Sequence, residues 1–134
     1  KISSLKDLAT LNKIAIGSPK SVPAGEYAME ALKKANIDLK LKDKLVMARN
    51  VRKCLMYAER GEVDGAFVYK TDAGIMGRNV KVLFIVPQPL YPRVTYKIAL
   101  TRAGSGKKEA ADFYRFMLSK QARKVLTKYG FAVK

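Results

Sequence analysis

A strand, a loop and a helix follow one another at residues 13–35, which read KIAIGSPKSVPAGEYAMEALKKA. The apolar run at residues 13–16 predicts a short strand, and Gly17-Ser18-Pro19 predicts its end. Pro23 stands just before the next apolar run, where its fixed φ and missing N–H suit a first helical turn. Apolar residues then recur at helical spacing as far as Ala35: Tyr27, Ala28, Ala31, Leu32 and Ala35. This unit is typical of an α/β fold.

A second unit of the same kind follows. Residues 45–48 predict a strand, and Asn50 can cap the helix after it. The apolar face of that predicted helix contains Val51, Cys54, Leu55 and Ala58. Gly61 is a natural C-terminal stop, because glycine adopts the left-handed conformation that ends many helices.

Further strands are predicted where β-branched and aromatic residues gather, at residues 65–69, 80–86 and 94–100. Residues 72–76 predict a short turn or helix between the first two. The prolines of residues 87–92 oppose regular structure and predict a connector.

The C-terminal part predicts a flexible turn at residues 103–106 and two helices. The apolar faces of these helices contain Ala110, Phe113, Tyr114 and Met117 in the first, and Ala122, Val125, Leu126 and Tyr129 in the second. Strands that alternate with helices predict an α/β fold in which helices flank a mostly parallel sheet.

Composition excludes several classes of site. The 134 residues are enough for one domain with a hydrophobic core. The absence of His removes the commonest general base and every His-based nucleophile pair or metal site. A single cysteine, Cys54, excludes a disulfide within the chain and any Cys-cluster metal site. Cys54 falls on an apolar helix face, so we interpret it as a core residue.

The formal net charge is +16, from 27 Lys and Arg against 11 Asp and Glu. Such an excess favours an anionic partner: nucleic acid, an acidic membrane face or a small anion. The cations are scattered along the whole chain without a block or an aromatic-interleaved stripe, which argues against nucleic acid. A salt-dependent DNA shift assay would test that reading.

Three strand-to-helix junctions are the best candidates for chemistry: residues 16–24, 48–51 and 68–72. In a parallel sheet these junctions meet at the carboxyl ends of the strands, where ligands bind. Helix N-termini there present unpaired N–H groups and a positive dipole end, so the ligand class they favour is an anion. The alternative is that these are ordinary turns, with Tyr69 an ordinary aromatic residue at a strand end. Asp64 and Asp72 are interpreted as a turn residue and a helix cap.

Three runs of sequence closely resemble the periplasmic molybdate-binding proteins of ABC transporters. They are residues 15–28 (AIGSPKSVPAGEYA), 48–52 (ARNVR) and 61–73 (GEVDGAFVYKTDA). The end of the chain, residues 113–131, also resembles that family. In the family, the alanine of VPAG, the valine of NVR and the tyrosine of VYxxDA contact the oxyanion. The resemblance therefore implies that Ala24, Val51 and Tyr69 bind the ligand.

The resemblance also implies a type II periplasmic-binding-protein-like fold, represented here in part. Residues 1–90 would form the second lobe, with the N-terminal portion of the family missing. Residues 91–134 would supply the return strand and the C-terminal helices, which normally pack on the absent first lobe. The apolar faces of those helices then predict self-association.

The implied function is that of a solute-binding component of an ABC importer, which captures molybdate or tungstate and is not an enzyme. No cofactor and no direct metal ligand is implied, because the oxyanion binds through its oxygens. The implied partners are the permease subunits of the transporter, and no nucleic acid is expected. The implied location is periplasmic, or extracytoplasmic with a membrane anchor. An alternative is the oxyanion-sensing domain of a transcriptional regulator.

Overall fold

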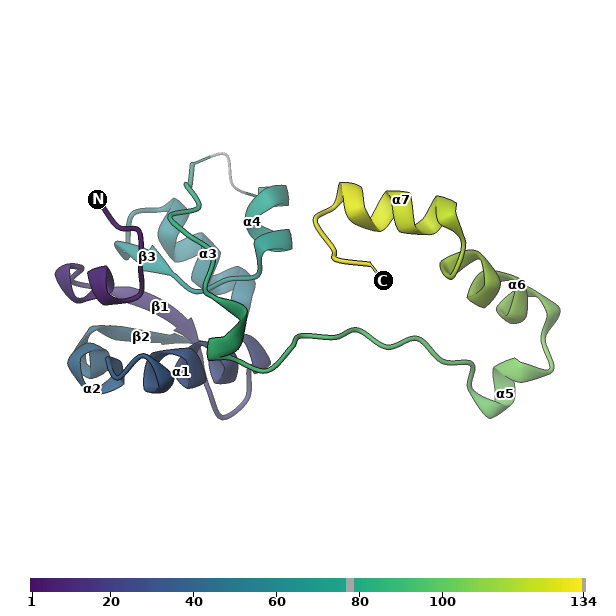
Figure 1. The fold of residues 1–134 in the computed structure, drawn as a ribbon, viewed down its shortest axis with the longest axis horizontal. Helices are drawn as coiled ribbons and strands as arrows, with labels where there is room; N and C mark the ends of the chain where they lie inside the picture. Colours follow the sequence, from purple (N-terminus) through teal and green to yellow (C-terminus); the bar gives the residue numbers. More distant parts are fainter. Residues whose placement is uncertain (77–78, 134) are drawn as a thin grey trace. The chain divides into compact units, whose positions relative to one another are not determined.

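The computed structural model describes residues 1–76 and 79–133 of the chain. Contacts divide the chain into two compact units, Lys1–Arg93 and Val94–Lys134. The first unit contains the sheet and most of the buried side chains, whereas the second is helical, as Figure 1 shows.

The sheet of the first unit has three parallel strands in the order β2-β1-β3. These strands are β1 (Ile14–Gly17), β2 (Leu45–Ala48) and β3 (Gly65–Ala66). Ile14 pairs with Leu45 on one side and with Gly65 on the other. Parallel strands need crossover connections. The connection from β1 to β2 contains α1 (Pro23–Lys34), and the connection from β2 to β3 contains α3 (Val51–Glu59).

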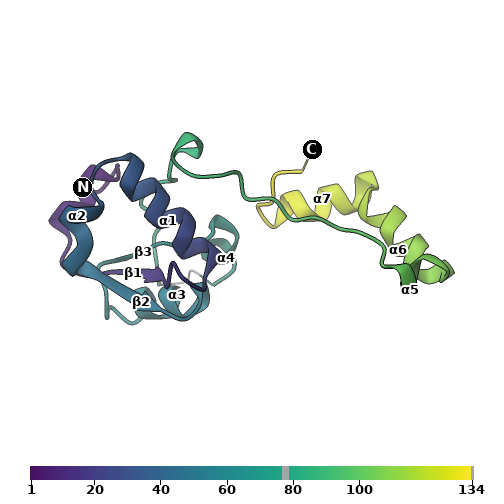
Figure 2. The same ribbon diagram turned by 90° about the horizontal axis from the view of Figure 1, so that it is seen from below.

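The strand β1 separates two hydrophobic cores. Ile14 packs in a cluster with Ala31 and Leu32 of α1, whereas Ala15 packs with Cys54 of α3. Successive side chains of a strand point to opposite faces, so α1 and α3 cover opposite faces of the sheet. Figures 1 and 2 both show β1 lying between the two helices. The predicted α/β architecture with a parallel sheet is therefore confirmed.

Shorter helical elements complete the first unit. They are η1 (Lys6–Thr10), α2 (Asp38–Leu41), η2 (Lys42–Lys44), α4 (Lys70–Met76) and η3 (Gln88–Leu90). The Lys44 ammonium donates to the carbonyl oxygens of Ala9 and Leu11 at 2.6 and 2.7 Å. This pair of hydrogen bonds ties η2 to the end of η1.

The predicted helix signals have their expected local roles. Pro23 is the first residue of α1, and the Asn50 side chain accepts a 2.8 Å hydrogen bond from the Lys53 N–H at the start of α3. Gly61 follows α3 with a φ of +68°, and the Glu62 N–H donates to the Tyr57 carbonyl. These two bonds satisfy backbone groups that helix ends leave without partners.

The second unit contains α5 (Arg102–Ser105), α6 (Lys108–Met117) and α7 (Lys120–Lys128). Thr101 and Ser119 cap α5 and α7 through side-chain oxygens. Ala122 is the one described residue of this unit that is buried. The predicted helices at the C-terminus are confirmed, but the predicted turn at residues 103–106 is wrong, because the Thr101 cap starts a short helix there.

Three strand predictions need correction. The strand predicted at residues 65–69 ends at Ala66, because the chain turns into α4, although the Phe67 N–H still donates to the Ala15 carbonyl. The segments 80–86 and 94–100 form no strand within the described residues. Their β-branched residues favour extended backbone, but a strand also needs a neighbour to pair with. In the first of these segments, Phe84 and Val86 instead pack against the α1-side core.

Candidate anion-binding site

The three predicted junctions follow the carboxyl ends of the three parallel strands, and contacts join the first two of them. Gly17 and Ala48, the last residues of β1 and β2, are paired in register. The Ser18 N–H donates to the Ala48 carbonyl at 2.8 Å, which joins the loop after β1 to the end of β2. Because β1 is the central strand, its loop lies between the loops after β2 and β3. Figure 1 shows the arrowheads of β1 and β2 ending side by side.

Ala24 occupies the first turn of α1 and is buried. The loop before it closes on itself, since the Ser21 and Val22 N–H groups both donate to the Ser18 carbonyl. The Gly25 N–H then donates to the Val22 carbonyl at 2.9 Å. Across residues 1–76 and 79–133, no carbonyl or side chain accepts a hydrogen bond from the Ala24 N–H. That N–H is one of the donors that a helix start offers to a ligand.

A close backbone approach holds α1 at this edge. A Cβ on Gly25 would overlap the carbonyl group of Gly17, and a Cβ on Gly17 would lie 2.6 Å from Cγ1 of Val22. Only glycine lets two backbone segments approach this closely. The first turn of α1 therefore rests directly on the end of β1.

Val51 is the first residue of α3 and is half-buried. Asn50 caps this helix with its side chain, and its carbonyl accepts from the Cys54 N–H at 3.4 Å. The donors of these two bonds are the Lys53 and Cys54 N–H groups, so neither bond involves the Val51 N–H. The Val51 N–H has no hydrogen-bond acceptor among the residues that the structure describes. The start of α3 thus offers a second backbone donor.

Tyr69 immediately precedes α4 and is half-buried. Its carbonyl accepts hydrogen bonds from the Asp72 and Ala73 N–H groups, each at 3.1 Å, so Tyr69 forms the N-terminal turn of α4. The phenol group is therefore carried by the third junction of the same sheet edge. Ala24, Val51 and Tyr69 each belong to one of the three predicted junctions.

Of the remaining candidates from the sequence, Cys54 and Asp64 have structural roles. The interpretation of Asp72 as a helix cap is wrong, because α4 begins at Lys70 and Asp72 lies within its first turn. Burial raises the pKa of the Cys54 thiol to about 11, and its Sγ donates to the Asn50 carbonyl at 3.5 Å. The Asp64 carboxylate accepts hydrogen bonds from the backbone N–H groups of Lys13 and Asn12 at 2.9 and 2.7 Å. These bonds lower the pKa of its carboxyl group. Asp64 therefore fastens the start of β1 next to the start of β3.

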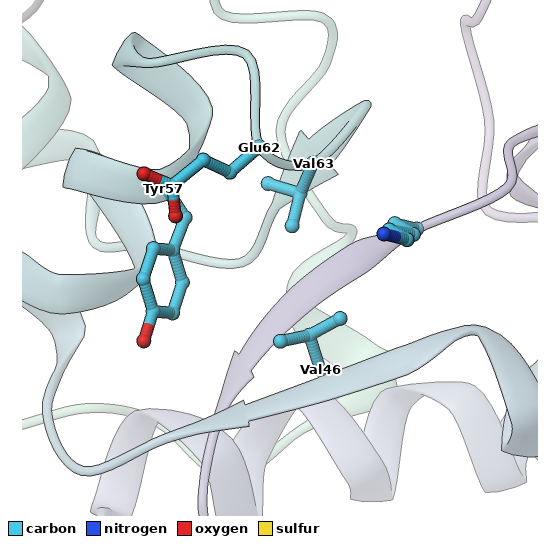
Figure 3. A pocket seen from close by; sticks show the side chains of 5 residues that line it. Val46, Tyr57, Glu62 and Val63 are labelled. Carbon is cyan, nitrogen blue, oxygen red and sulfur yellow. The ribbon is translucent and has the colours of Figure 1, made fainter.

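A separate pocket of about 320 Å³ lies on the α3 side of the sheet, nearer the amino ends of the strands. Its lining residues are Lys13, Val46, Tyr57, Glu62 and Val63. Figure 3 shows the Tyr57 ring opposite the two valine side chains. Sequence patterning missed this pocket, because its residues come from β2, α3 and the segments that precede β1 and β3, and share no motif. It contains none of the three predicted ligand residues.

Comparison with known proteins adds an independent finding. Residues 1–132 match the family of bacterial extracellular solute-binding proteins. The chain is similar to YvgL of Bacillus subtilis, named as a proposed ABC-transporter substrate-binding lipoprotein, with 39% identity over 97% of this chain and 50% of that protein. It is similar to ModA of Haemophilus influenzae, named a molybdate-binding protein, with 37% identity over 99% of this chain and 50% of that protein.

One solved structure extends the likeness to the fold. It is a substrate-binding domain from Clostridium difficile, named for a proposed molybdenum ABC transporter. The match has a TM-score of 0.86 at 35% identity and covers 100% of this chain and 59% of that one. The chain spans about half the length of the curated relatives it matches.

Proposed function

Because the chain belongs to the family of bacterial extracellular solute-binding proteins, we propose that it is the part of an ABC importer's binding component that captures molybdate or tungstate. The observation that carries the proposal is the pair of backbone donors at one sheet edge. Ala24 and Val51 offer N–H groups at the starts of two helices, and the Ser18–Ala48 hydrogen bond joins the loops that bear them. The relative named for molybdate supports the choice of ligand.

Neutral donors suffice for such an ion. Neither the Ala24 nor the Val51 side chain can hydrogen-bond, so these residues would bind through their backbone N–H groups. The positive ends of the α1 and α3 dipoles add favourable potential for negative charge. The Tyr69 hydroxyl would donate a third hydrogen bond, and bonds to a charged acceptor are stronger than neutral ones.

Selection among oxyanions would then depend on size. Molybdate, tungstate and sulfate are all tetrahedral dianions with four similar acceptor oxygens. Donors held on rigid backbone distinguish such ions by the space between them, because an ion of the wrong size leaves a donor unpaired. We therefore expect molybdate and tungstate to be preferred over sulfate.

We assign residues 1–90 to the second lobe of a two-lobed binding protein and residues 91–134 to its return strand and C-terminal helices. In this arrangement the protein binds its solute without chemical change and delivers it to permease subunits. The proposed location is extracytoplasmic, in the periplasm or at a membrane anchor, as the family description suggests. No helix built from the described residues is long and apolar enough to cross a membrane.

We also propose that the 134-residue chain self-associates through its second unit. Large apolar side chains are exposed on α6, on α7 and on the segments around them: Phe113, Phe116, Leu118, Val125 and Tyr129. An apolar surface of this kind tends to be covered by a partner in solution. A second copy of the chain presents the same surface.

An NMR titration of the ¹⁵N-labelled chain with sodium molybdate tests the binding proposal. We expect the amide signals of Ala24 and Val51 to shift, with half-saturation at about millimolar concentration, because only three donors reach the ion. The amides of Lys120 and Gln121, at the start of α7, are the control for attraction to any helix start. An absence of shifts at Ala24 and Val51, or equal shifts at α7, would contradict the proposal.

A further inference from the structure

The approach of Gly25 to Gly17 does more than seat a helix on a strand. Ala24 directly precedes Gly25, so the position of its N–H follows that of Gly25. The neighbour of Gly25 is the backbone of Gly17, which cannot move without disturbing the pairing of β1. The three atoms nearest to a Cβ on Gly25 all belong to the Gly17 backbone, so the overlap is not with a side chain that could turn away.

The second donor is tied to the same strand. Gly17 is paired with Ala48 in the sheet, and the Ser18–Ala48 hydrogen bond extends this connection into the loop. Val51 follows Ala48 by three residues, and the Asn50 cap holds the intervening turn. The path from one donor to the other thus runs through backbone contacts and one short capping bond.

We infer that Gly25 is a positioning residue that sets the separation of the Ala24 and Val51 N–H groups, and thereby the size of the tetrahedral dianion selected. The inference rests on the proposed function. A side chain at position 25 would push the first turn of α1 away from β1 and change the gap between the donors. Selection by size requires that one ion contact both donors at once. If the gap between the donors no longer fits an ion, the ion contacts only one of them, and the selectivity between molybdate and sulfate falls.

The variant Gly25→Ala tests this, with the ratio of molybdate to sulfate affinity as the readout. A substitution that only destabilises the fold lowers the fraction of the protein that can bind. The apparent affinities for both anions then fall by the same factor, and their ratio is unchanged. A displaced donor changes the ratio itself. We expect a ratio of about 10 or more in the wild type, in the range that site geometry alone achieves, and at least a threefold lower ratio in Gly25→Ala.

Two further glycine variants serve as matched comparisons. Gly61→Ala strains a backbone with a φ of +68° beyond the far end of α3, and its new Cβ meets no atom within 4 Å. We expect Gly61→Ala to lower the stability of the fold but to keep the wild-type ratio of molybdate to sulfate affinity. A Cβ on Gly17 would lie 2.6 Å from Cγ1 and 2.9 Å from Cβ of Val22, the buried residue that precedes α1. This overlap is smaller than that of a Cβ on Gly25, so the ratio for Gly17→Ala should fall between those of the wild type and Gly25→Ala. Circular dichroism verifies the fold of each variant, and Gly17→Ala decides the matter if Gly25→Ala does not fold.

The possible outcomes distinguish a failure of the proposed function from a failure of the role inferred for Gly25. A wild-type chain whose Ala24 and Val51 amides ignore molybdate contradicts the proposed function. The second outcome is that the wild type binds molybdate but Gly25→Ala and Gly17→Ala keep the wild-type ratio of molybdate to sulfate affinity. This outcome overturns the role of Gly25 and leaves the proposed function standing. A wild-type ratio of molybdate to sulfate affinity near one also overturns the role of Gly25, because the donor pair then does not distinguish ions by size.

Discussion

The backbone N–H of Ser18 donates a 2.8 Å hydrogen bond to the carbonyl oxygen of Ala48. Through this bond the loop that leads to Ala24 and the loop that leads to Val51 form one piece of structure. A ligand held by both N–H groups would therefore bind a preformed surface, which lowers the ordering cost of binding.

Replacing Val51 by proline deletes a donor while keeping its helix. Proline is favoured at the first helical position, and Asn50 has the extended backbone, φ −162° and ψ 167°, that a residue before proline requires. We expect Val51→Pro to weaken molybdate binding by about tenfold or more, the cost of one hydrogen bond to a charged acceptor. Val51→Ala keeps the N–H and should change affinity by less than about twofold. Equal affinities for the proline and alanine variants in an NMR titration would exclude this donor.

Tyr69→Phe should weaken molybdate binding while leaving the fold intact. Loss of a hydrogen bond to a charged acceptor costs about 1.5–3 kcal/mol, which is about tenfold or more in Kd. The control is Tyr57→Phe, since Tyr57 is also half-buried but lines the separate pocket. Titration calorimetry that finds the same Kd for wild type and Tyr69→Phe would remove Tyr69 from the site.

Light scattering should show a mass above the 14.9 kDa of a single chain. Phe113 and Val125 are 59% and 48% exposed, and removal of such apolar area from water favours association. The double variant Phe113→Ser/Val125→Ser should shift the mass toward that of the monomer. The matched substitution Leu39→Ser, at an exposed apolar residue of the first unit, should have no such effect. A monodisperse wild-type monomer would refute self-association.

Acid should destabilise the first unit partly through Asp64. Hydrogen bonds from the Lys13 and Asn12 N–H groups lower the pKa of this carboxyl below its ordinary 3.8. A lowered folded-state pKa stabilises the fold above the unfolded-state pKa, and this contribution disappears as the pH falls through the folded-state value. Asp64→Ala should therefore lower Tm at pH 6 and show a smaller further decrease below about pH 4 than the wild type. Asp43→Ala, at an exposed carboxyl in η2, is the control; parallel Tm profiles for wild type and Asp64→Ala would contradict the assignment.

Local signals in the sequence predicted much of the first unit. The strands β1 and β2, the Asn50 cap and the stop at Gly61 depend on short-range backbone preferences, and all four were correctly predicted. The strands predicted at residues 80–86 and 94–100 were wrong within the described residues, because strand formation depends on a distant partner that local composition does not reveal. The short helix α2 carried no signal that we recognised.

Some features of the candidate site were likewise predicted from the sequence, and others were not. Membership of the solute-binding family was predicted from three motifs and is confirmed by the match over residues 1–132. The placement of Ala24, Val51 and Tyr69 on three junctions followed from the alternation of strands and helices. The contact of Gly25 with Gly17 was not foreseen, because sequence alone does not show which backbone segments meet. The roles of the three ligand residues stay predictions.

Main-chain donors have a consequence for how ligand preference is recorded in a sequence. An alanine and a valine that bind through N–H groups could each be exchanged for many other residues without loss of the contact. Proline is the exception, because it alone lacks the donor. The preference of this site would therefore be encoded less by the residues that touch the ion than by those that shape the turn around it. Two proteins with different residues at positions 24 and 51 could share a ligand, and two with identical ones could differ if position 25 gained a side chain.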